Sequence, residues 1–183
     1  MSRLPGSYTY STAQGFHASE LALSALGIGW LKRIESLHLS PYDDQTGKPI
    51  SAWVKGASIG YGHLILAGEW DTYKDGIDDA QAESLLRNDL KPAERAVQRN
   101  VRVSLQQYQY DALVAFAFNI GVSGFAGSSA LRLINDPAAT TAYSSLESAW
   151  KAWNKSQGKV MSGLNNRRNA EWLTWTSARY GHW

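Results

Sequence analysis

LQQYQYDALVAFAFN, at residues 105–119, is apolar on nearly every side when it is drawn as a helix. Leu113, Val114 and Phe116 occupy different sides of a helix with 3.6 residues per turn, and Phe118 adds a further ring. A helix that is apolar all round is buried. The run therefore predicts a central helix around which the rest of the domain packs.

Amphipathic patterns on both sides of this run predict further helices. Ser24 is a suitable N-cap for a helix whose apolar residues Leu31, Ile34 and Leu37 recur at spacings near 3.6, and Ser40-Pro41 is expected to end it. A long helix is expected from Asp78 to about Val97. Three shorter helices are expected near residues 128–134, 141–153 and 165–178, after a turn at 121–127.

The segment from Tyr42 to His63 differs from these helical regions in composition and pattern. Glycines and a proline divide it into short stretches, of which Ile50–Val54 and Ala57–Tyr61 are expected to be strands. Strands gathered in one short region and helices elsewhere indicate an α+β fold with a small antiparallel sheet.

Composition limits the possible classes of protein. The chain has 183 residues, enough for one domain, and its net charge of +2 from 18 basic and 16 acidic residues argues against nucleic-acid binding. It has no cysteine, and no apolar run approaches the length of a membrane span. We expect residues 1–19 to be a flexible arm or linker remnant, residues 20–183 to be the domain, and the protein to be a monomer.

Two carboxylates are candidates for chemistry. Glu35 follows Ile34 at the edge of the apolar stripe, near the end of its helix, where partial burial and the helix dipole favour the protonated form that a general acid needs. Asp44 lies nine residues later, just past the helix. One apolar and one solvated carboxylate across a cleft suit glycoside hydrolysis, although most such pairs are ordinary surface charges.

The sequence around these carboxylates resembles the active-site signature of phage-type lysozymes, glycoside hydrolase family 24. The similar blocks stay in family order and cover about residues 24–173: Ile34-Glu35, Tyr42-Asp43-Asp44, Ser58-Ile59-Gly60-Tyr61-Gly62-His63, 81–90, 109–121 and 163–171. The resemblance implies a two-lobed lysozyme-like fold, in which a small antiparallel sheet lobe and a helical lobe are joined by a long helix.

The resemblance also implies a role for each matched position. Glu35 matches the general acid and Asp44 the carboxylate that positions or activates water. Ser58 stands where the family usually has a threonine, and its hydroxyl can still orient a water. The gap from Asp44 to Ser58 is longer than the usual family spacing, because residues 48–56 extend the hairpin.

Four more residues receive expected roles from the resemblance. His63 and Asp89 match a structural pair, although a histidine beside the site could also be catalytic. Asn119 matches a polar residue that touches sugar, but an asparagine before a glycine is equally expected at a plain helix end. One of two adjacent arginines, with Arg168 favoured over Arg167, is expected to approach Glu35 from the helical lobe and contact substrate.

The activity implied is that of a lysozyme (EC 3.2.1.17). It would hydrolyse the β-1,4 bond from N-acetylmuramic acid to N-acetylglucosamine in peptidoglycan, with inversion and without a metal or cofactor, and cause bacterial lysis. The chain shows no recognisable signal peptide, so we expect synthesis in the cytoplasm and action on the wall after release or delivery. The alternative is a lysozyme-like module that binds peptidoglycan without cleaving it.

Overall fold

The structure is a computed structural model that describes residues 15–181. The longer helices are α1 (Ala25–Ile34), α3 (Asp79–Asn100), α4 (Gln107–Ile120) and α8 (Ser162–Ser177), and the shorter ones are α2 (Trp70–Tyr73), α5 (Val122–Gly127), α6 (Ser129–Asn135), α7 (Leu146–Lys151) and the 3-10 turns η1 (Ala18–Glu20) and η2 (Ala67–Glu69). The strands are β1 (His38–Asp43), β2 (Ala57–Gly60), β3 (His63–Leu64), β4 (Lys155–Ser156) and β5 (Lys159–Val160).

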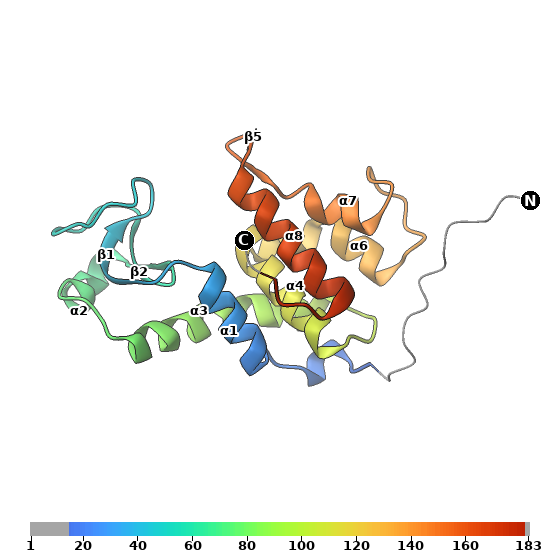
Figure 1. Cartoon of the computed structure of the whole chain (residues 1–183), viewed down its shortest axis with the longest axis horizontal. Helices are drawn as coiled ribbons and strands as arrows, with labels where there is room; N and C mark the ends of the chain where they lie inside the picture. Colours follow the sequence, from blue (N-terminus) through green and yellow to red (C-terminus); the bar gives the residue numbers. More distant parts are fainter. Residues whose placement is uncertain (1–14, 182–183) are drawn as a thin grey trace, which may run out of the picture.

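Two lobes with separate hydrophobic cores make up the molecule. In the small lobe, Ala57, Ile59 and Ile65 are buried beneath the three-stranded antiparallel sheet β1-β2-β3. The larger core lies among α1 and α3–α8, and Ile77 packs against both cores. Figure 1 shows α3 running along the bottom of the molecule between the sheet, on the left, and the helical lobe, on the right. The expected α+β, two-lobed fold is confirmed.

Helix α4 is the centre of the helical lobe. Every residue from Gln109 to Ala117 is buried, as the apolar pattern predicts. The buried carboxylate of Asp111 accepts hydrogen bonds from Ser24 N (3.0 Å), the Ser24 hydroxyl (2.5 Å) and the Tyr180 hydroxyl (2.7 Å). The centre of the lobe is thereby tied to the start of α1 and to the segment after α8.

Helix α1 begins as predicted and ends earlier than predicted. The Ser24 hydroxyl accepts a hydrogen bond from Gly27 N (2.9 Å), which confirms the N-cap. The helix ends at Ile34, however, and residues 38–43 form strand β1. Pro41 does not end a helix but lies within β1, which is an edge strand and so tolerates a residue without an N–H group.

Several other local predictions are wrong. Ile50–Val54 forms no strand, because the chain leaves the sheet there and β3 pairs with β2 instead. Residues 121–127 form helix α5 rather than a turn, since the buried Phe125 packs edge-on against Phe116 of α4. The helix expected over 141–153 is only Leu146–Lys151, and the β4–β5 hairpin was not anticipated.

The prediction that residues 1–19 form a flexible arm is wrong for the last of these residues, which pack on the domain. Phe16 exchanges two backbone hydrogen bonds of 2.8 Å with Leu105, and Ala18 is buried in the main core. Residues 1–14 lie outside the described part of the chain. Among residues 15–181, no helix is long and apolar enough to cross a membrane.

A histidine–aspartate pair joins the sheet lobe to α3. His63 Nδ1 lies 3.0 and 3.1 Å from the two carboxylate oxygens of Asp89, as predicted. The hydrogen bond to Asp89 raises the pKa of the His63 imidazole above its ordinary value, against the opposing effect of burial. The protonated histidine therefore binds its partner best.

We expect His63→Asn to lower Tm most in mildly acidic buffer. Because the pKa of His63 is raised in the folded state, the pair's stability is fully present below the unfolded value of about 6.5 and is lost as pH rises through the folded value. Thermal melts from about pH 5 to pH 9 measure the effect, and Asp89→Asn should give the same trend. An equal loss of Tm at every pH would contradict the pairing.

Candidate active site

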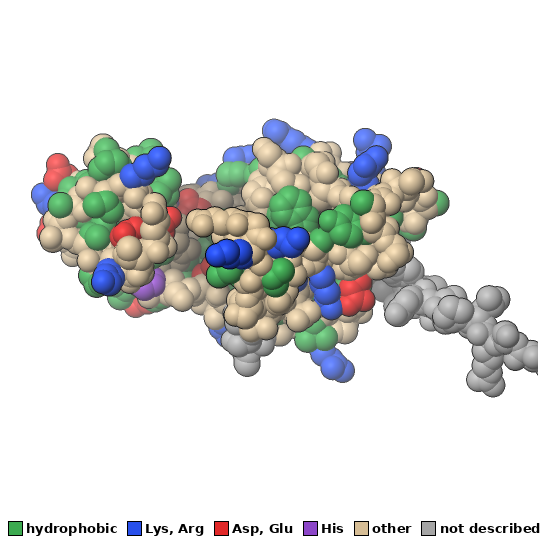
Figure 2. All heavy atoms as spheres, turned by 90° about the horizontal axis from the view of Figure 1, so that it is seen from above, with side chains coloured by type: hydrophobic (Ala, Val, Ile, Leu, Met, Phe, Trp, Pro, Cys, Tyr) green, Lys and Arg blue, Asp and Glu red, His purple; other side chains and the backbone are tan. Residues whose placement is uncertain are grey.

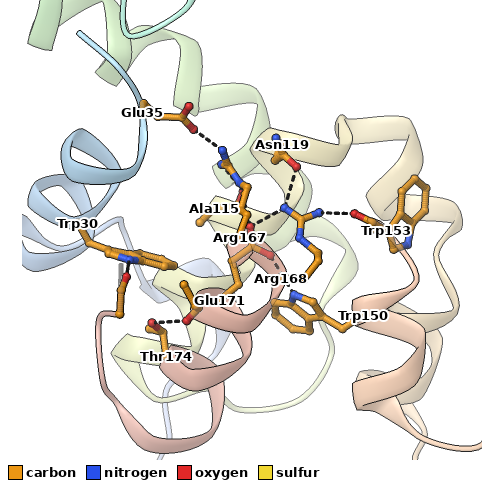
Figure 3. Close-up of polar contacts among 12 residues, drawn as sticks. Trp30, Glu35, Ala115, Asn119, Trp150, Trp153, Arg167, Arg168, Glu171 and Thr174 are labelled. Carbon is orange, nitrogen blue, oxygen red and sulfur yellow. Dashed lines mark hydrogen bonds and ion pairs between the residues drawn. The ribbon is translucent and has the colours of Figure 1, made fainter. Parts of the chain in front are cut away.

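The carboxylate of Glu35 lies between α1 and α8. Glu35 is the C-cap residue of α1, and its backbone N–H donates to Leu31 O (2.9 Å). Its side chain is 20% exposed and forms an ion pair with Arg167, whose Nη1 lies 2.7 Å from Glu35 Oε1. Figure 3 shows the two side chains pointing toward each other from the two helices. The first helix of the domain and its last are therefore linked through one carboxylate.

Arg167 is itself held by a second carboxylate. Its Nε donates to Glu171 Oε1 (3.1 Å), one helical turn later in α8. Glu171 is fully buried and also accepts hydrogen bonds from Arg168 Nη2 (2.7 Å) and Trp150 Nε1 (3.0 Å). Buried charges need partners because desolvation is costly, and here each carboxylate has at least one cation. The network fixes where the Arg167 guanidinium can lie.

The expectation that Arg168 approaches Glu35 is wrong, because Arg167 makes that contact. Neighbouring residues of a helix point about 100° apart, so only one of the two arginines can face α1. Arg168 instead donates to Asn119 Oδ1 (2.7 Å) and to the Trp153 carbonyl (3.3 Å), as Figure 3 shows. It is 1% exposed, and burial lowers the pKa of its guanidinium while Glu171 opposes that effect.

Burial also excludes Arg168 from direct contact with substrate. Asn119, in contrast, is exposed at the end of α4, and only its carbonyl oxygen is engaged by Arg168. The amide nitrogen of Asn119 therefore remains a donor on the surface. Arg168 acts on this surface through Asn119, whose orientation it fixes.

The two adjacent aspartates of the sheet lobe have different surroundings. The Asp43 carboxylate accepts hydrogen bonds from Gln45 N (3.0 Å) and the Thr46 hydroxyl (2.9 Å), so it stabilises the turn after β1. Asp44 is exposed, and no described residue donates a hydrogen bond to its carboxylate. Asp44 is therefore the free acceptor of the pair.

Strand pairing brings Asp44 and Ser58 to neighbouring positions. Asp44 N donates to Gly56 O (3.1 Å), and Tyr42 lies opposite Ser58 in the β1–β2 register. Asp44 is the first residue after β1, so it lies beside this pair, next to Gly56. The Ser58 hydroxyl is nearly buried and donates to Gly56 O (3.3 Å).

Tyr42 and Glu171, to which the sequence assigned no role, belong to the site, and so does Arg167, which was only the less favoured of the two arginines. Burial raises the pKa of the Tyr42 phenol, and the nearby charges of Asp44 and Glu35 raise it further. Tyr42 is thus close enough to both candidate carboxylates for their charges to act on the pKa of its phenol. A signal for Arg167 was present, since it lies four residues before Glu171, the spacing of a helical ion pair.

The site combines a half-buried carboxylate beside a cation with a solvated carboxylate after β1, and the charges of both act on Tyr42. Figure 2 shows the molecule narrowing between the small lobe, on the left, and the helical lobe. Among the described residues, no group of three or more His, Asp or Glu side chains could hold a metal ion. The groups present can donate a proton from one side and accept one on the other.

Comparisons with known proteins show the family to which the chain belongs. The family described as phage lysozyme matches residues 32–171, which include Glu35, Asp44 and the Arg167–Glu171 pair. The chain is 37% identical over 153 residues to the endolysin of Salmonella phage P22, covering 82% of this chain and 95% of that protein.

Two other relatives extend the comparison. The endolysin of Bacillus phage PZA is 37% identical over 151 residues, which cover 82% of this chain but 54% of that protein, so the chain spans about half the length of this relative. Among solved structures, the endolysin from Escherichia coli O157:H7 phage FAHEc1 superposes with a TM-score of 0.70 at 27% identity, covering 88% of this chain and 98% of that chain.

We expect Arg167→Leu to lower the free energy of unfolding by about 3–5 kcal/mol, the usual cost of removing one partner from a buried ion pair. Glu35 and the buried Glu171 would each lose a cation. Chemical denaturation measures the change. Arg33→Leu is the matched control, because Arg33 is exposed on α1 without an ion pair to any residue from 15 to 181, and it should cost no more than about 0.5 kcal/mol. Equal losses would contradict the network.

Proposed function

Because the chain belongs to the phage lysozyme family, we propose that it is a muramidase that hydrolyses the β-1,4 bond from N-acetylmuramic acid to N-acetylglucosamine in peptidoglycan. The observation that carries the proposal is the position of Glu35, half-buried at the end of α1 and paired with Arg167 of α8. The matched relatives named endolysins come from phages that infect bacteria. Cleavage of the wall glycan would cause lysis of the bacterium.

Glu35 would protonate the oxygen of the leaving sugar. Glu35 is the C-cap residue of α1, and its side chain faces Arg167 of α8. When the proton is transferred, Glu35 becomes an anion, and the adjacent Arg167 guanidinium stabilises that anion. Arg167 would thus help Glu35 to release its proton during bond cleavage.

Asp44 and Ser58 would direct the attacking water. The exposed Asp44 carboxylate has both oxygens available to accept a proton from water, in contrast to Asp43. Water attacking from the face opposite Glu35 gives an inverted product, a geometry that requires carboxyl groups roughly 6.5–9.5 Å apart. Asn119, held by Arg168, would donate a hydrogen bond to a bound sugar.

The alternative is a module that binds peptidoglycan without cleaving it. Both carboxylates are present: Glu35 is paired with Arg167, and the exposed Asp44 carboxylate accepts no hydrogen bond from a described residue. A pure binding site would gain little from a buried ion-pair network around an acidic side chain, since sugars are neutral hydrogen-bonding ligands along most of their length. These observations favour the enzyme.

We expect Glu35→Gln to reduce lysis of purified walls by at least about 100-fold, the usual contribution of a general acid. The amide keeps the shape of the carboxylate and can still accept a hydrogen bond from Arg167, so the folded protein should still sediment with insoluble peptidoglycan. Turbidity and co-sedimentation assays measure the two properties. A folded Glu35→Gln protein that lyses walls at more than about a tenth of the normal rate would refute the assignment.

We expect Asp44→Asn to lower kcat by at least about tenfold, and Asp43→Asn to lower it by less than about threefold. Asp43 should instead affect Tm, because its carboxylate stabilises a turn. The two variants are matched, being adjacent and isosteric. Kinetics on purified peptidoglycan, with Tm measured in parallel, compare them, and a larger loss of kcat from Asp43→Asn would show that the wrong aspartate was assigned.

A further inference from the structure

Gly56, the residue before strand β2, contacts both candidate water-directing residues. Its carbonyl oxygen accepts hydrogen bonds from Asp44 N (3.1 Å) and from the Ser58 hydroxyl (3.3 Å). Asp44 directly follows β1 and Ser58 lies in β2, 14 residues later, and no other described residue is hydrogen-bonded to both. The peptide group of Gly56 therefore fixes the two residues relative to each other.

Gly56 also leaves room that the Asp44 side chain occupies. A Cβ atom at position 56 would overlap Asp44 Oδ1 and would lie 3.2 Å from Asp44 Cγ. Any other side chain would therefore push the Asp44 carboxylate out of its place. The backbone of Gly56 has φ +99°, a conformation that residues with a side chain rarely adopt. Two independent constraints thus require glycine here.

The hydrogen bond from Ser58 to Gly56 determines what Ser58 can offer to a water molecule. A serine hydroxyl has one donor and two acceptor sites, and the donor is used by Gly56 O. Ser58 and the Asp44 carboxylate therefore both present acceptors. A water between two acceptors donates both of its hydrogens, which leaves its oxygen lone pair free to attack the sugar carbon.

We infer that Gly56 is a positioning residue, which holds the Asp44 carboxylate and the acceptor face of Ser58 in the arrangement that orients the attacking water. The inference rests on the proposed function, because it assumes that Asp44 activates water. It explains how a long loop from residue 44 to residue 56 can still place Asp44 beside Ser58. The chain re-enters the sheet at Gly56, whose Cα lies against the Asp44 carboxylate and whose carbonyl is bonded to both residues.

The test compares Gly56→Ala with Gly47→Ala. Gly47 lies in the same hairpin with φ +68°, and a Cβ there would have no atom within 4 Å, so it controls for backbone strain alone. Both variants should lower Tm, Gly47→Ala by about 2–4 °C. Gly56→Ala should lower kcat by at least about tenfold with KM changed less than about threefold, whereas Gly47→Ala should leave kcat within about twofold. Equal kcat values for the two variants would overturn the inference.

A double variant separates positioning from general damage to the fold. In an Asp44→Ala background the carboxylate that meets the new methyl group is absent. Gly56→Ala should then leave the residual kcat unchanged within about twofold and lower Tm by no more than Gly47→Ala does. Additive losses in kcat and Tm would contradict the inference.

Two further outcomes are also decisive. If the single variant Gly56→Ala does not fold, the double variant that also carries Asp44→Ala decides the question. A folded double variant supports the contact between position 56 and Asp44, and an unfolded double variant overturns the inference. If Asp44→Asn lyses walls normally, the proposed function fails and the inference with it. If Asp44→Asn is impaired while Gly56→Ala is as active as Gly47→Ala, only the inference about Gly56 fails.

Discussion

The site depends on one chain of charges, from Glu35 through Arg167 to the buried Glu171. Glu171 cannot be buried as an anion without cations beside it, and Arg167 and Arg168 supply them from its own helix. Once Arg167 is fixed in this way, its outer nitrogen fixes Glu35 on α1. Arg168, turned to the other side, fixes Asn119 at the end of α4. Three helices are therefore held in register by polar contacts at the surface where substrate would bind.

The small lobe contributes the solvated carboxylate of the site, Asp44. Backbone geometry, rather than buried charge, determines where this carboxylate lies. The hydrophobic core of the lobe is small, formed among the described residues by Ala57, Ile59 and Ile65, and the His63–Asp89 pair ties the lobe to α3. The carboxylate of Asp44 has no polar side-chain partner among residues 15–181, so its position follows from the strand pairing and from the glycine beneath it. The two carboxylates are thus held by unlike means, which suits unlike roles as acid and base.

Patterns that span many residues allowed good predictions from the sequence. The buried helix α4, the N-cap at Ser24, the start of a long helix near Asp78 and the His63–Asp89 pair are all confirmed. Predictions failed where tertiary contacts override local preference. Pro41 indicated a helix end but lies in an edge strand, and residues 121–127 form a helix because Phe125 is buried. The choice between Arg167 and Arg168 depends on the rotation of α8, which two adjacent arginines do not reveal.

Glu35 and Asp44 are proposed to act as an acid–base pair on the glycan, with water as the nucleophile. Analysis of the products from purified peptidoglycan tests it most directly. The account predicts new reducing ends on N-acetylmuramic acid, with the α-anomer formed first from the β-linked substrate, as nuclear magnetic resonance early in the reaction would detect. Ring-closed anhydro sugars would show that a sugar hydroxyl replaces water. A first-formed β-anomer, or release of peptides from intact glycan, would contradict the account.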